Sequence, residues 1–293
     1  WRMVKRAIRP GVYDLFVLIG GLWLAGISVI HLLYAVMPVL GHALHYFQRA
    51  AICFDVALLA GFAFNSLLGI LAAILPHFLS TSRANPRARS TLILFNVALV
   101  GWVGATGWSL QFPYTWVRLA LSLFSVFLFA ALVYILIDLK AYDWLGATVE
   151  GPRRVVARMT ASATVICGLV GGALLAGIGI GLGATSAISL PHVEIITQQV
   201  MQIGVGGFGL LALYTGLLGP AASTDWSFRM VLTASVLLAG ALVGLTLSEI
   251  AVAIDYSVAY DPRVAYGMLS GAYLLVAVWL VSRLPWGSQS TQA

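Results

Sequence analysis

The sequence predicts an all-α protein, a polytopic transmembrane helical bundle that forms a single domain over residues 1–293. Three observations predict it: 61% of the residues are hydrophobic, only 9% are charged, and the mean hydropathy is +0.98. A soluble domain needs a more polar surface than this composition can supply. Hydrocarbon offers the backbone no hydrogen-bond partners, so a spanning chain forms helices or a closed barrel. The apolar runs are roughly 20–30 residues long, which fits helices and is too long for barrel strands.

Apolar runs separated by charged residues, prolines or glycines divide the chain into about eight spans. The first run follows four basic residues and continues beyond Trp23 without a small-residue cleavage site. This pattern predicts a retained span rather than a secretion signal. The expected spans are residues 12–40, 50–79, 90–112, 115–139, 155–182, 192–219, 227–254 and 264–282.

The basic residues predict the orientation of these spans. If the loops alternate between two sides, thirteen of the sixteen Lys and Arg residues share one side with both termini, and Arg49, Arg118 and Arg263 lie on the other. Loops rich in Lys and Arg stay in the cytoplasm, so both termini are expected there and the expected location is the inner (plasma) membrane. Indole rings favour the headgroup region. The tryptophans near expected span ends are Trp116, Trp144, Trp226 and Trp286.

Two of the expected spans resemble each other. Residues 61–76 read GFAFNSLLGILAAILP, and residues 204–220 read GVGGFGLLALYTGLLGP. Each begins with glycine and ends with proline before a loop expected in the cytoplasm. This likeness and the even number of spans are compatible with a duplication whose halves are residues 1–145 and 146–293.

Ionisable side chains inside the expected spans are candidate functional residues, because each costs roughly 2.5–3.5 kcal/mol on insertion scales. In the expected topology most of them gather toward the outer side. The amides of Gln198, Gln199 and Gln202 share one helix face, which we expect to face the bundle interior. The outer-side histidines are His31, His42, His45 and His192, and the outer-side carboxylates are Asp55, Glu194, Glu249, Asp255 and Asp261.

The histidines suggest a cofactor, since imidazoles on facing helices are common ligands of haem iron and copper. His31 and His192 are expected at similar depth and could hold one b-type haem, with His42 and His45 nearby; copper, or no cofactor, is the alternative. His42 and His45 could instead be interfacial residues, and His192 could cap a helix. Seven glycines within residues 168–183 indicate either close helix packing or room for a flat cofactor.

The two glycine-to-proline spans, together with Pro-His-Val-Glu-Ile at residues 191–195, resemble the main subunit of the haem–copper oxidase and nitric oxide reductase superfamily. The resemblance covers about a third of the chain. It implies that His192 is a metal ligand and that Glu194 is the neighbouring carboxylate. Asp55 lies near the position of the histidine that binds haem in the family. The family's other histidine ligands have no counterpart in this sequence. The resemblance therefore implies a degenerate relative that has lost the oxygen- or NO-reducing centre.

These observations lead to three hypotheses about function. The first is a membrane subunit of a respiratory electron-transfer complex, b-type cytochrome-like, that passes electrons between quinol and an outer-face redox protein. The second is a haem-free structural subunit that holds other membrane subunits in an oxidoreductase complex. The third is a proton or small-solute transporter with a polar path along Asp55, Gln198, Gln202 and Glu249. Nucleic-acid binding is not expected, because the basic residues are scattered over several loops and set the orientation.

Overall fold

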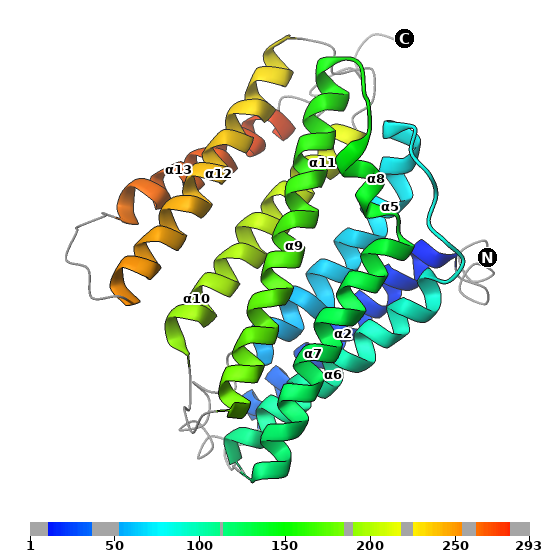
Figure 1. Cartoon of the computed structure of the whole chain (residues 1–293). Coiled ribbons are helices and arrows are strands. Elements are labelled where there is room, and N and C mark those ends of the chain that lie inside the picture. The colour runs from blue at the N-terminus through cyan, green and yellow to red at the C-terminus, as the bar shows by residue number, and fades with distance from the viewer. Residues whose placement is uncertain are drawn as a thin grey trace. The chain divides into compact units, whose positions relative to one another are not determined.

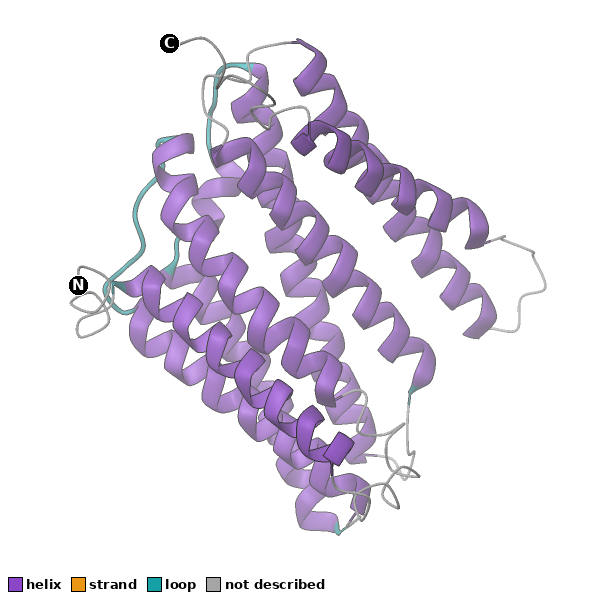
Figure 2. Cartoon of the chain, turned by 180° about the vertical axis from the view of Figure 1, so that it is seen from behind, coloured by secondary structure: helices purple, strands orange, loops and turns teal. Residues whose placement is uncertain are grey.

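The computed structural model describes residues 11–36, 53–111, 114–184, 190–217, 225–253 and 262–281. Within these ranges the chain is helical apart from short connections, and no strand occurs there. The long helices are drawn in Figure 1, and Figure 2 shows the same chain from behind. The predicted all-α class is thus confirmed for the described part of the chain.

Seven helices in the described ranges are long and apolar enough to cross a bilayer, so the chain has the make-up of a multi-pass membrane protein. The eighth expected span corresponds to α13, whose apolar stretch Arg263–Val278 is shorter. A short helix between the fourth and fifth spans was not expected. The helices are α2 (Val12–Val36), η2 (Ala57–Phe64), α5 (Asn65–Leu79), α6 (Ala88–Gln111), α7 (Thr115–Asp138), α8 (Ala141–Gly146), α9 (Pro152–Ala184), α10 (Pro191–Gln199), η3 (Val200–Gly207), α11 (Phe208–Leu217), α12 (Asp225–Ala253) and α13 (Pro262–Val281).

The chain divides into two compact units, Trp1–Leu217 and Leu218–Ala293. In the second unit α12 packs along α13, and small residues at the contact allow the helices to approach closely. Gly240 lies against Met268, and Gly271 lies against Leu237.

In the first unit α7 packs on both α6 and α9, and α2 packs on η2 and α5 (Figure 1). The core is made of large side chains that have no exposed surface, among them Phe16, Leu71 and Ile135. At one end of this unit a backbone hydrogen bond joins the connection after α5 to the end of α7: Asn85 N donates to Asp138 O over 2.7 Å. The helices therefore form one packed bundle with a defined connection at that end.

The tryptophans expected near the headgroups do not all lie on the surface. Trp116 is 63% exposed and stacks on Tyr114, with ring centroids 6.4 Å apart, as expected for an interfacial residue. Trp144 lies on α8, just after the fourth span, and is 0% exposed, so its indole packs inside the protein and is not on the surface. The short helix packs against α7 and α9 and carries the indole into the bundle. The side chain of Trp226, and Trp286 as a whole, lie outside the described residues.

Two spans contain π-helical segments. The first, η2, precedes α5, and the second, η3, joins α10 to α11. In a π-helix each N–H bonds the carbonyl five residues earlier. Such segments are rare in proteins, and those that occur often lie at functional sites. Both segments are eight residues long, they begin 143 residues apart, at residues 57 and 200, and Gly61 and Gly204 are the fifth residue of each. The two segments also contact each other.

Candidate functional site

Three of the candidate residues lie at one end of the first unit, which we call the Cys53 end. Here the second span begins at Cys53 and α10 begins at Pro191. The Cys53 thiol donates a weak hydrogen bond to Val103 O of α6, 3.7 Å away, and Glu194 is near enough to interact electrostatically with Cys53. Asp55, His192 and Glu194, all partly buried, therefore belong to the same end of the bundle.

Glu194 caps the start of α10. Its Oε1 accepts a hydrogen bond from Leu190 N over 3.0 Å, and its own N–H donates to Leu190 O over 2.9 Å. A carboxylate in the first turn satisfies a backbone donor that lacks a partner in the helix and interacts favourably with the helix dipole. The carboxylate that the resemblance placed beside a metal thus already has a structural role.

The other candidate histidines and carboxylates lie outside the described part of the chain or in the second unit. His31 lies in α2, and its side chain is outside the described part; His42 and His45 fall in residues 37–52, also outside it. Glu249 lies on α12, in the second unit. Helix α2 packs on α5, η2 and α6, whereas α10 packs on α9 and η3. Among the described residues no group of three or more His, Cys, Asp or Glu side chains could hold a metal ion.

The glutamine stripe does not face the interior along its whole length. Gln198 and Gln199 are partly buried, but Gln202 is exposed, so the expectation was wrong for Gln202. Gln202 lies within η3, where a π-helical turn holds more residues than an α-helical turn and rotates side chains away from the α-helical face. Gln199 Oε1 is buried and accepts no hydrogen bond from the described residues.

A buried hydrogen-bond network connects three spans, and sequence reasoning did not identify it. Trp23 Nε1 donates to Asn96 Oδ1 over 2.8 Å, and Asn65 Nδ2 donates to the same oxygen over 3.0 Å. Asn96 Nδ2 in turn donates to Leu92 O over 2.9 Å. The signal in the sequence was the pair of asparagines near the middle of two apolar spans.

The network also supports the π segment η2. Asn65 Nδ2 lies 2.7 Å from Gly61 O, a carbonyl within η2. The indole of Trp23 covers Gly61 so closely that a Cβ atom there would meet the ring at 2.5 Å. The irregular backbone therefore has a side-chain hydrogen bond to Gly61 O on one side and an aromatic ring on another.

The glycines of α9 are used for close packing. A Cβ atom at Gly171 would meet Met201 Sδ at 2.6 Å, a Cβ at Gly172 would overlap Leu132 Cδ2, and a Cβ at Gly179 would overlap Ser125 Oγ. Each of these positions is filled by a side chain of a neighbouring helix. At these three positions no space remains for a macrocycle, whereas a Cβ at Gly177 of the same helix would meet nothing within 4 Å.

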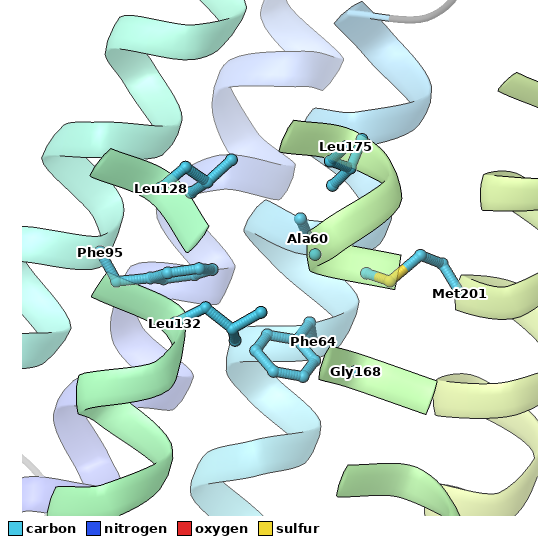
Figure 3. A pocket seen from close by; sticks show the side chains of 9 residues that line it. Ala60, Phe64, Phe95, Leu128, Leu132, Gly168, Leu175 and Met201 are labelled. Carbon is cyan, nitrogen blue, oxygen red and sulfur yellow. The ribbon is translucent and has the colours of Figure 1, made fainter. Parts of the chain in front are cut away.

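A small apolar cavity lies where the π segments meet α9. Figure 3 shows its lining side chains, which come from η2, α6, α7, α9 and η3. The cavity has a volume of about 20 Å³. Phe64 and Phe95 form one wall, with ring centroids 6.0 Å apart and planes inclined by 53°. The lining residues are Ala60, Phe64, Phe95, Leu128, Leu132, Gly168, Gly172, Leu175 and Met201.

The arrangement thus combines a buried polar network, a closely packed glycine-rich helix and a small apolar cavity, all within the first unit. None of these features is by itself the signature of a known activity. Comparison of the chain with models of protein families, with curated proteins and with solved structures finds no match.

Proposed function

We propose that the chain is a haem-free membrane subunit of a respiratory electron-transfer complex and that its helices hold partner subunits together. The observation that carries this proposal is the packing of α9, whose glycines at 171, 172 and 179 are covered by side chains of η3 and α7. Close helix contacts of this kind stabilise a bundle in lipid. They favour the structural hypothesis over the b-type cytochrome.

The respiratory setting rests on the resemblance of residues 191–195 and of the two glycine-to-proline spans to the haem–copper oxidase and nitric oxide reductase superfamily. The partners would be other membrane subunits and a redox protein at the outer face, with quinol as an electron donor of the assembly. The location would be the inner (plasma) membrane, with both termini in the cytoplasm.

The purified chain is expected to show no Soret absorption band, either as isolated or after addition of dithionite. Mild detergent extraction from its native membrane is expected to recover it with other membrane proteins in fixed ratio. A Soret band that disappears in His31→Ala or His192→Ala, but persists in His77→Ala, would overturn the proposal in favour of a cytochrome. His77 is the matched control because it is exposed near the far end of α5.

A second candidate, a proton or small-solute transporter, is supported by the pair of π segments. Transporters often place interrupted helices at corresponding positions of two halves, and the substrate binds between them. Here η2 and η3 are 143 residues apart and in contact, and Asp55 lies just before η2. The same offset aligns Ala-Leu-Val-Gly at 98–101 with Ala-Leu-Val-Gly at 241–244, which supports the duplication.

On the transporter hypothesis, proteoliposomes containing the chain should dissipate a pH gradient, and Asp55→Asn should reduce this flux to the rate of empty liposomes. The amide cannot release and rebind a proton, whereas the carboxyl group can. Glu150→Gln is the control, since Glu150 is exposed in the connection between α8 and α9 and should leave the flux unchanged. Equal flux through wild type and empty liposomes would exclude proton transport by the isolated chain.

A further inference from the structure

We propose that the cavity between η2, η3, α6, α7 and α9 is a binding site for one small, uncharged, apolar molecule that enters from the bilayer. All nine residues that line it are apolar. A cavity without polar partners does not hold water, and larger apolar cavities, on the order of 150 Å³, bind benzene or xenon. The lining thus selects against water and ions and in favour of an apolar guest.

The volume limits the size of this guest. A water molecule needs roughly 10–15 Å³ of cavity measured in this way. The cavity of about 20 Å³ therefore has room for one molecule somewhat larger than water. A diatomic gas or a single noble-gas atom fits this limit, whereas a lipid chain, a quinol ring or a haem does not.

The walls are held by features that resist collapse. On one side Phe64 and Phe95 lean against each other, and both are 3% exposed. Beside Phe64, Gly168 presents backbone, and a Cβ there would lie 3.2 Å from Phe64 Cε2. A void whose lining cannot relax forfeits dispersion contacts, which a guest of matching size would restore. Binding is thus driven by packing that the empty cavity lacks.

The route from lipid is short. Phe95 lines the cavity from α6, and Val97 on the same helix is 54% exposed. Leu128 lines it from α7, and Val126 on that helix is 56% exposed. A single layer of helices therefore separates the cavity from the apolar surface of the first unit. Apolar gases dissolve in hydrocarbon, so the guest need not pass through the polar groups of the Cys53 end.

Xenon is the probe for this site, applied to the full chain in lipid nanodiscs and followed by ¹²⁹Xe exchange NMR. We expect a protein-bound xenon signal for the wild type and its loss, to the level of empty nanodiscs, in Ala60→Val. The added methyl groups would occupy the cavity from η2. Ala57→Val is the matched control, because Ala57 is also buried in η2 but does not line the cavity, and it should keep the signal.

Circular dichroism and thermal unfolding establish that each variant is folded. If Ala60→Val does not fold, Leu128→Phe fills the cavity from the opposite wall and should likewise remove the signal. A wild type indistinguishable from empty nanodiscs overturns the proposal. So does a folded cavity-filling variant that keeps the full wild-type signal. These outcomes are independent of the Soret measurement, so the cavity and the subunit role can fail separately.

Discussion

Replacing Gly179 by alanine is expected to lower the free energy of unfolding of the first unit by about 1–3 kcal/mol, the usual cost of an overpacked core. The new Cβ would overlap Ser125 Oγ and lie 2.8 Å from Trp102 Nε1. Neither neighbour can yield easily, because Ser125 Oγ donates to Leu121 O over 2.7 Å and Trp102 is 0% exposed. Unfolding by SDS titration in mixed micelles, followed by circular dichroism, measures the loss.

Gly177→Ala provides the control on the same helix. A Cβ at Gly177 meets nothing within 4 Å, so alanine there should be neutral or should stabilise the helix by up to about 1 kcal/mol through its higher helix propensity. Adding Ser125→Gly to Gly179→Ala removes the overlapping oxygen and should recover part of the loss. Equal destabilisation at positions 177 and 179 would show that α9 does not pack on α7 through this glycine.

The spans were predictable because their signal is local. A run of about 20 apolar residues is long enough to cross a bilayer whatever surrounds it. The described helices accordingly begin and end within a few residues of the expected bounds: residues 115–139 were expected for the fourth span, and α7 is Thr115–Asp138. Apolar runs do not report helix type, so the π segments in the second and sixth spans were not foreseen.

The polar network was not predictable because it depends on which helices are neighbours. Asn65 and Asn96 are 31 residues apart, and Trp23 and Asn96 are 73 apart, so no spacing rule connects them. Ionisable residues stand out in an apolar sequence because of their high cost in lipid. The uncharged amides and the indole cost less individually, yet they form the described network.

The expected pairing of His31 with His192 depended on information that the sequence does not contain. Similar depth in the expected topology was the only argument for pairing His31 with His192, and depth does not specify which helices face each other. In the structure α2 and α10 pack on different sets of helices. The capping role of Glu194 was not predicted, because the sequence suggested His192 as the cap, although a carboxylate in the first turn of a helix that begins with proline is a typical capping arrangement.

Replacing Asn65 by leucine is expected to destabilise the first unit by roughly 1–3 kcal/mol, the cost of leaving buried polar groups unpaired. Asn65 is 0% exposed, and its amide donates to Gly61 O and to Asn96 Oδ1. Leucine keeps the branched shape of the asparagine side chain but is larger, so the loss combines the lost hydrogen bonds with overpacking of a buried site. The same SDS titration measures it, with circular dichroism as the readout of helix content.

The double variant Asn65→Leu/Asn96→Leu separates a network from two independent contacts. Each single variant breaks the hydrogen bonds between the two asparagines, although Asn96 keeps Trp23 Nε1 and Leu92 O as partners and Asn65 keeps Gly61 O. The double variant breaks these shared bonds only once, so its loss should be smaller than the sum by about 0.5–3 kcal/mol. Thr160→Val is the control partner for Asn65→Leu, because Thr160 Oγ1 bonds only carbonyls of its own helix, and that pair should be additive. Additivity of the two asparagine variants within about 0.5 kcal/mol would mean that the amides act separately, and η2 would then need another source of support.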